Sequence, residues 1–168
     1  MINPDDYFYC LRNFPDLENE YVNQGLSATF TLKQPAPVIF AAKANIENSY
    51  IYKILLSHTK IMEMNWLMFP AKSNYNWHTD RFGRNCAVNI PIRVPDDAKT
   101  FCREPMFHGA KEPFIWYNVE QVEYIINKPT ILNVKREHCV INSSNQDRII
   151  LSISFDESYE IILDYMTS

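Results

Sequence analysis

The sequence has little of several features that mark particular classes of protein. Lysine and arginine total 16 against 20 aspartates and glutamates, for a net charge of -4, so no excess of positive charge attracts phosphate. This balance argues against nucleic acid as a partner. No apolar run approaches the ~20 residues that cross a bilayer, which argues against a membrane partner. The acidic N-terminal segment lacks the basic and apolar regions of a secretory signal.

Cysteine, histidine and glycine are also scarce. The four cysteines, at positions 10, 86, 102 and 139, include no CxxC pair. This favours reduced thiols and a cytoplasmic location, with a disulfide or a zinc cluster as the alternatives. Only four histidines are present, so little metal or acid–base chemistry can be built on this side chain.

The residues that are abundant indicate a globular protein. Of the 168 residues, 46% are hydrophobic and 21% are charged, which is typical of a folded chain. A chain of this length predicts one domain over residues 1–168.

Hydrophobic periodicity predicts a mainly β protein. Apolar residues at helical spacing predict a helix over residues 45–58, with Asn45 as its N-cap. Short segments rich in Ile, Val, Phe and Tyr, separated by turn residues, predict a sandwich or barrel whose outer face the helix covers. The predicted strands are 38–43, 61–69, 75–80, 85–94, 100–107, 114–118, 130–134, 138–142, 148–155 and 159–165.

A His-x-Asp pattern lies in one of these strands. His78 and Asp80 are two residues apart and would share a face, which suits two ligands of one metal. By the same alternation, Tyr75 and Trp77 would face away from His78 and pack in the core. His138 begins a later strand that could return beside the first. Taken singly, each histidine is equally compatible with a structural role.

The other two histidines suit other positions. His58 ends the predicted helix, where a cation favours the dipole. His108 lies in a predicted loop and is the alternative third ligand, although no strand bearing an arginine follows it at a suitable distance.

The segment 148–155 alternates between two kinds of residue. One face is apolar throughout, and the other carries Arg148, Ile150, Ser152 and Ser154. A polar face headed by arginine predicts a cavity, in which the guanidinium fork suits a carboxylate. The alternative is an exposed edge strand with Arg148 in solvent. Two histidines and one carboxylate form the facial triad of non-haem Fe(II) oxygenases.

Together these motifs resemble those of the Fe(II)/2-oxoglutarate-dependent dioxygenases over about residues 60–156. The resembling motifs are His78-Thr79-Asp80, His138 and Arg148 with Ser152. The surrounding stretches are most similar to the aspartyl/asparaginyl β-hydroxylase and prolyl-hydroxylase-like branches, although aspartyl β-hydroxylases typically lack the carboxylate ligand. The resemblance implies a double-stranded β-helix, a cupin-like jelly roll of two sheets with one or more N-terminal helices on the outer sheet face.

The resemblance also implies an activity. Fe(II) would be bound by His78, Asp80 and His138, and 2-oxoglutarate and O2 would be consumed to hydroxylate a peptide or protein side chain or a small metabolite. Succinate and CO2 would be released. Arg148 would hold the distal carboxylate of 2-oxoglutarate, assisted by Ser152.

Weaker candidates surround these residues. Arg84 and Asn89 are predicted to contact the cosubstrate, and Arg81 and Asn142 the substrate or a ligand. Two alternatives to the hydroxylase stay open: a cupin-like metal protein that does not use 2-oxoglutarate, and a non-catalytic jelly-roll binding module. Replacing Arg148 tests the first alternative, and metal analysis tests the second.

Overall fold

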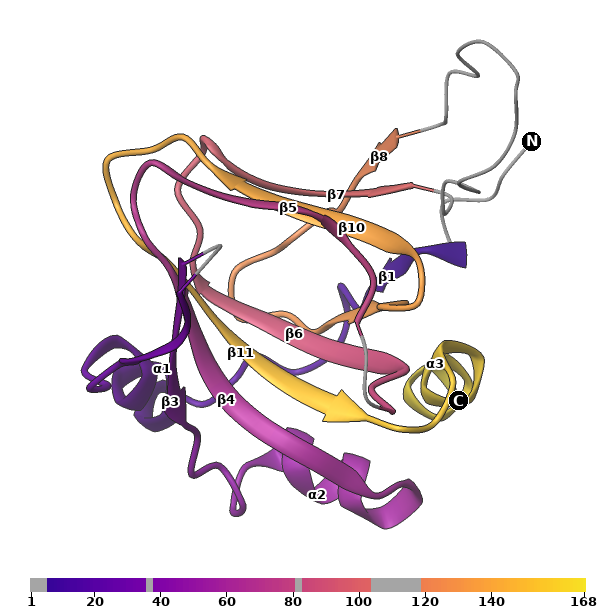
Figure 1. The fold of residues 1–168 in the computed structure, drawn as a ribbon. Coiled ribbons are helices and arrows are strands. Elements are labelled where there is room, and N and C mark those ends of the chain that lie inside the picture. The colour runs from indigo at the N-terminus through magenta and orange to yellow at the C-terminus, as the bar shows by residue number, and fades with distance from the viewer. Residues whose placement is uncertain (1–5, 36–37, 81–82, 104–118) are drawn as a thin grey trace, which may run out of the picture.

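Two antiparallel sheets face each other in the computed structural model, which describes residues 6–35, 38–80, 83–103 and 119–168 (Figure 1). The larger sheet has the order β1-β9-β6-β11-β4-β3-β2, and the smaller has the order β5-β10-β7-β8. The strands of the larger sheet are β1 (Phe8–Cys10), β2 (Thr31–Pro35), β3 (Val38–Lys43), β4 (Ile61–Phe69), β6 (Cys86–Arg93), β9 (Thr130–Leu132) and β11 (Arg148–Phe155). Those of the smaller sheet are β5 (Ser73–His78), β7 (Ala98–Arg103), β8 (Val119–Gln121) and β10 (Glu137–Asn142).

In the part of the chain that the structure describes, three helices cover the outer face of the larger sheet, and the core lies beneath them (Figure 1). They are α1 (Asn19–Leu26), α2 (Tyr50–His58) and α3 (Tyr159–Thr167). Their buried residues, such as Tyr21, Leu55 and Ile162, form one cluster with Trp66 and Leu151 of the sheet. The mainly β prediction with N-terminal helices on the outer face is therefore confirmed.

Strand β11 occupies the middle of the larger sheet, between β4 and β6. Its apolar side chains Ile149, Leu151, Ile153 and Phe155 all belong to the core under the helices, as their alternation predicts. All eight residues of β11 are buried, so the opposite face, which carries Arg148, also lies inside the molecule. An exposed edge strand at this position is thereby excluded.

Two predictions about the helices were wrong. Residues 159–165 were predicted to form a strand but lie in α3, because Ser158 accepts a hydrogen bond from the Ile161 amide and Tyr159, Ile162 and Met166 are buried at helical spacing. The helix predicted over residues 45–58 starts at Tyr50 rather than at residue 45. Its N-cap is the buried Ser49, which accepts a hydrogen bond from Tyr52, and not Asn45.

The remaining differences concern short segments. The periodicity of the sequence did not predict α1, β1, β2 and β8. The predicted strand 114–118 and His108 lie outside the described residues, as do residues 104–107 of the strand predicted at 100–107.

Helix α1 approaches the sheet closely through Gly25. A Cβ atom there would lie 2.5 Å from Ile92 Cδ1 and 2.6 Å from Trp66 Cε3. The Trp66 indole donates a hydrogen bond of 3.0 Å to Gln24 Oε1, which holds the ring against the helix. Only glycine leaves room for this contact.

The cysteines bear on the prediction of reduced thiols. All four cysteines are free, which agrees with reduced thiols rather than a disulfide. Burial raises the pKa of the Cys102 thiol to about 12.

Among the described residues, no helix has the length and apolar character needed to span a membrane.

Candidate metal centre and cosubstrate cavity

A β-bulge in β5 sets the direction of His78. His78 pairs with His138 across β5 and β10, but Tyr75 pairs with Val140, so β5 contains one residue more than its partner between these pairs. Tyr75 and His78 therefore face the same cavity, with ring centroids 4.0 Å apart. The prediction that Tyr75 faces away from His78 was wrong, because strict alternation fails at a bulge.

Trp77 was predicted to pack in the core, and this prediction was also wrong. It is partly exposed, and the Arg103 guanidinium lies 4.1 Å from its ring centroid. Arg103 in turn pairs with Glu137 at 2.7 Å. Trp77 thus packs against a neighbouring ion pair instead of entering the hydrophobic core.

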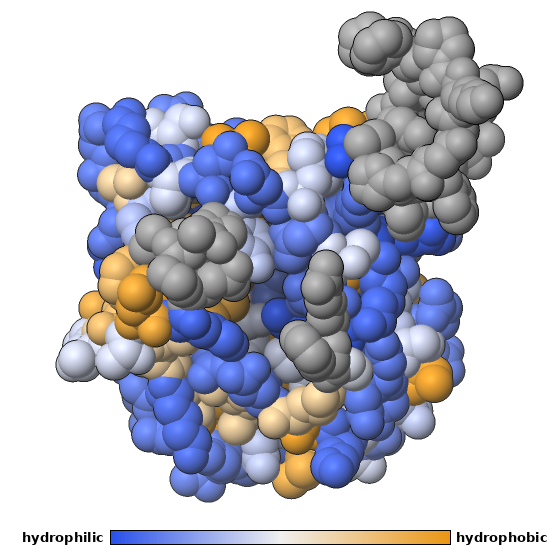
Figure 2. Space-filling model, in the orientation of Figure 1, coloured by the Kyte–Doolittle hydropathy of each residue, from blue (hydrophilic) through white to orange (hydrophobic). Residues whose placement is uncertain are grey.

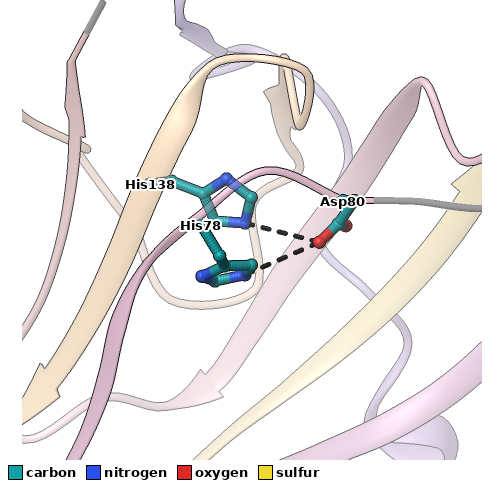
Figure 3. A group of neighbouring side chains, drawn as sticks. All are labelled: His78, Asp80 and His138. Atoms are coloured by element: carbon teal, nitrogen blue, oxygen red, sulfur yellow. Dashed lines mark ion pairs between the residues drawn. The ribbon is translucent and has the colours of Figure 1, made fainter. Parts of the chain in front are cut away.

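Three side chains converge where β5 ends beside β10 (Figure 3). Oδ1 of Asp80 lies 3.6 Å from His78 Nε2 and 3.8 Å from His138 Nε2. The candidate ligand atoms all lie within 4.8 Å of one another, which is compatible with a single metal ion between them. The structure therefore brings together the two histidines and the carboxylate that the sequence selected.

The backbone fixes the tautomer of both histidines. His78 Nδ1 lies 2.7 Å from the Asn76 carbonyl oxygen, and His138 Nδ1 lies 3.0 Å from that of Arg136. Donation of each Nδ1 proton to a carbonyl leaves Nε2 with a free lone pair directed at the centre. This is the arrangement that a metal-binding imidazole requires.

Burial keeps these imidazoles neutral. It lowers the pKa of His138 to about 4, helped by the neighbouring His78. Burial also lowers the pKa of His78 from its ordinary value, against the opposing effects of the Asn76 carbonyl and Asp80. Both rings are then available as neutral ligands near pH 7.

Arg84 holds the second oxygen of the carboxylate. Its Nη1 lies 2.9 Å from Asp80 Oδ2, and its Nη2 donates a hydrogen bond of 2.8 Å to Ser152 Oγ. Oδ1 thus faces the histidines, while Oδ2 forms an ion pair with Arg84. A carboxylate held in this way binds a metal through one oxygen, which preserves open coordination positions for other ligands.

Arg148 lies at the inner end of the same cavity and is fully buried. Its Nη1 donates a hydrogen bond of 2.7 Å to Thr100 Oγ1, and its guanidinium lies 4.8 Å from the ring centroid of Tyr124. Its Nε and Nη2 have no hydrogen-bond partner among the described residues. Burial lowers the pKa of Arg148, but the group stays charged, so these donors call for an anion.

Asn89 and Ser152 line the cavity between Arg148 and the triad. They are opposite one another on β6 and β11, and both are buried. Asn89 Nδ2 donates to the Tyr124 hydroxyl at 3.2 Å, whereas its Oδ1 has no hydrogen-bond partner in the described part of the chain. Both predicted cosubstrate contacts therefore border the space beside Arg148.

Asn142, one of the two predicted substrate residues, does not line the cavity. Asn142 Nδ2 donates to the carbonyl oxygens of Phe69, Pro70 and Gln146, and its Oδ1 accepts from Ser144. Its amide is thus committed to holding a loop, which leaves no donor for a substrate. Arg81 lies outside the described residues.

Sequence reasoning missed several residues that line the cavity, among them Tyr75, Thr100 and Tyr124. Thr100 and Tyr124 contact Arg148 from segments outside the larger sheet, and Tyr75 contacts His78 because of the bulge. No spacing in the sequence indicates which residues meet across two facing sheets. The aromatic and hydroxyl character of these side chains was the only available signal.

The cavity opens outward into a wider groove. The inner cavity has a volume of about 80 Å³ and the groove about 780 Å³. Six side chains border both spaces: Ile39, Leu67, Tyr75, His78, Asp80 and Arg84. In the space-filling view, a hollow lies between the sheets with mostly hydrophilic residues around it (Figure 2). The triad thus stands at the junction between an enclosed cavity and an open groove.

Comparison with solved structures finds the same fold in several oxygenases. A prolyl-4-hydroxylase from Pseudomonas putida is 12% identical, covers 88% of this chain and 91% of its own, and has a TM-score of 0.60. An oxidoreductase of the 2OG-Fe(II) oxygenase family from Burkholderia pseudomallei is 10% identical, covers 92% and 86%, and has a TM-score of 0.59. The α-ketoglutarate-dependent epimerase SnoN of nogalamycin biosynthesis is 14% identical, covers 79% and 67%, and has a TM-score of 0.56.

The chain has the jelly-roll fold of these oxygenases. At identities this low the likeness shows the fold alone, and the aspartyl/asparaginyl β-hydroxylase branch is not represented among the structures compared above. A scan against protein-family models finds no match, and a search of curated proteins also finds none. The site must therefore be judged from its own residues.

Proposed function

We propose that the protein is an Fe(II)- and 2-oxoglutarate-dependent oxygenase that hydroxylates its substrate. The observation that carries the proposal is the placement of His78, Asp80 and His138 in one cavity with the buried Arg148. The fold shared with 2OG-Fe(II) oxygenases supports it.

The donor set fits Fe(II). Two neutral imidazoles and one carboxylate, with further positions open, are the ligands that non-haem Fe(II) oxygenases use. Fe(II) bound here with 2-oxoglutarate would supply the oxygen chemistry that hydroxylates a C–H bond while succinate and CO2 are formed. His78, Asp80 and His138 would hold the metal, and Arg84 would keep Asp80 bound through Oδ1.

The inner cavity fits a dicarboxylate. The free donors of Arg148 would pair with the distal carboxylate, and Ser152 and Asn89 border the path toward the triad. An anion there would pair with the two guanidinium nitrogens, Nε and Nη2, that have no hydrogen-bond partner among the described residues. The apolar walls contributed by Leu132, Val134 and Ile150 would exclude water from the bound cosubstrate.

Formation of succinate tests the proposal. Purified protein with Fe(II) and 2-oxoglutarate should produce succinate under air, and His78→Ala and His138→Ala should abolish it. Succinate formation that persists in both variants would overturn the proposal. Loss of succinate with unchanged metal binding in Arg148→Ala would confirm the role of the guanidinium and exclude a metal protein that works without 2-oxoglutarate.

Two classes of substrate are compatible with the proposed activity. The sequence favours a peptide or protein side chain or a small metabolite, and among the structural neighbours SnoN was crystallised with Fe3+, α-ketoglutarate and nogalamycin RO. A small organic molecule is therefore the substrate class that a structural neighbour supports.

A further inference from the structure

We propose that the outer groove receives a substrate bearing a carboxylate, or a similar oxyanion, bound by Arg84 next to an aliphatic segment. This inference rests on the proposed function, because it concerns the site once metal and cosubstrate are bound. The groove volume of about 780 Å³ lies within the range of roughly 300–1,000 Å³ typical of small-molecule sites.

The junction determines which part of a substrate reaches the metal. Ile39, Leu67 and Tyr75 border both the inner cavity and the groove, so an apolar collar surrounds the entrance to the triad. Aliphatic carbon fits this collar better than a charged group, because a charge there would lose its hydration. The carboxylate of the substrate would then lie to one side of this collar, where Arg84 borders both spaces.

The charges of the loaded site favour an anion in the groove. Fe(II) and Arg148 bring three positive charges, which two carboxylates of 2-oxoglutarate and Asp80 balance. Before loading, Arg84 is balanced by Asp80 at 2.9 Å. After loading, the negative charge of Asp80 is shared with the metal, so Arg84 carries a positive charge without an equal partner.

The other charges of the groove do not cancel this excess. Among the described groove residues, Lys33 and Glu63 form an ion pair of 3.2 Å and balance each other. Although burial alone would raise it, the Asn65 hydrogen bond and the charges of Lys33 and Arg84 hold the pKa of Glu63 below its ordinary value. Glu63 is therefore ionised near pH 7, but one carboxylate faces two cations, Lys33 and Arg84, so an excess of one positive charge remains in the groove.

The guanidinium has donors to spare. Arg84 uses Nη1 for Asp80 and Nη2 for Ser152, and each of these nitrogens carries a second N–H on a side chain that is 26% exposed. Its Nε is buried and has no partner among the described residues. It borders both spaces, so a carboxylate arriving along the groove meets it beside the apolar collar. Arg84 would then be a specificity-determining residue as well as the support of Asp80.

A matched set of small probes tests the inference. Protein saturated with redox-inert Zn(II) and 2-oxoglutarate is titrated with hexanoate, hexanamide and hexylamine by calorimetry, so that the inner carboxylate positions are already filled. Hexanoate should bind about tenfold or more tightly than hexanamide, as a charge-assisted contact requires, and hexylamine should bind most weakly. Equal binding of hexanoate and hexanamide, or a preference for hexylamine, would overturn the inference.

Variants that are expected to change hexanoate binding in opposite directions strengthen the test. Arg84→Gln should remove the preference for hexanoate, and Arg84→Lys should keep part of it. Glu63→Gln should tighten hexanoate binding because it leaves Lys33 unpaired. Arg12→Gln, at an exposed ion pair with Glu123 that does not border the groove, should change nothing. An unchanged preference in Arg84→Gln, or weaker hexanoate binding in Glu63→Gln, would contradict the assignment.

Binding of 2-oxoglutarate to the Zn(II) protein is measured first and separates the two proposals. Its failure would overturn the proposed function, and the groove inference with it. Normal 2-oxoglutarate binding without a preference for hexanoate would overturn the groove inference alone.

Discussion

Arg148 shows how a single residue can be placed for binding at a cost in stability. A fully buried guanidinium with two nitrogens lacking partners is unfavourable in the empty protein. Replacing such a charge with an apolar side chain of similar length is often neutral or stabilising. Of the two described arginines that line the cavity, Arg84 and Arg148, only Arg148 is fully buried.

We therefore predict opposite effects of Arg148→Met on stability and on binding. Without ligands, the variant should melt at the same temperature as the wild type or higher. With metal present, the rise in melting temperature caused by 2-oxoglutarate should be lost, since about tenfold or more of the affinity depends on charge-assisted hydrogen bonds. Thermal unfolding monitored by circular dichroism measures both effects.

Arg103 provides the control for this prediction. It is also largely buried but is paired with Glu137 and stacked on Trp77. Arg103→Met should lower the melting temperature without changing the effect of 2-oxoglutarate. A strongly destabilised Arg148→Met that still responds to 2-oxoglutarate would show that Arg148 is structural.

Replacing two different histidines distinguishes a metal ligand from a histidine outside the metal site. His138→Ala should weaken Zn(II) or Fe(II) binding by more than ~100-fold, because loss of mere supporting contacts already costs roughly 10–100-fold. His58→Ala should bind metal normally, since His58 stacks on Tyr165 at the end of α2. Competition with a chromophoric chelator measures both affinities, and equal losses in the two variants would contradict the assignment of the triad.

Site residues of a scarce type or in a clear alternating pattern could be predicted from the sequence. Residues that reach the site only through the way the chain folds could not. His78, Asp80, His138, Arg148 and Ser152 could be selected because histidine is scarce and because β11 alternates so clearly. Tyr75 could not, because its direction depends on a bulge. The contacts of Asn142 could not be predicted either, because sharing a face with His138 does not reveal that its amide donates to nearby carbonyl groups.

At the scale of elements, α1 depends on one glycine. Gly25→Ala should destabilise the protein by ~1–3 kcal/mol, as overpacking of a tight contact does. This loss should occur even though alanine favours a helix over glycine by ~1 kcal/mol. The added methyl group would meet Trp66 and Ile92, and the Trp66 ring is held by Gln24.

Chemical denaturation compares this variant with Asn23→Ala, an exposed change in the same helix. Asn23→Ala should be neutral or slightly stabilising, because it adds helix propensity without a clash. If Gly25→Ala were as stable as Asn23→Ala, the close approach of α1 to the sheet would be wrong.

Elements with one dominant pattern were predictable, and elements with two competing patterns were not. The bounds of β3, β4 and β11 match the prediction, because each is a continuous apolar or alternating run. Helix α3 was predicted as a strand because it is rich in Ile and Tyr, which favour strands. Capping by Ser158 and packing against the sheet decide in favour of a helix.

At the scale of the molecule, the candidate site is divided between the two sheets. The smaller sheet and the segment after β5 contribute the triad, and the larger sheet contributes Arg148, Ser152 and Asn89. A ligand that reaches from the triad to Arg148 would contact both sheets at once. Binding of metal and 2-oxoglutarate should therefore be coupled, with each increasing the affinity for the other.

Anaerobic calorimetric titration of 2-oxoglutarate, with and without Fe(II), tests this central claim most directly. We predict one binding site per chain in the presence of Fe(II), and affinity at least about tenfold lower without the metal or in Arg148→Met. Equal affinity with and without Fe(II), or unchanged affinity in Arg148→Met, would contradict the claim that the triad and Arg148 form one metal and cosubstrate site.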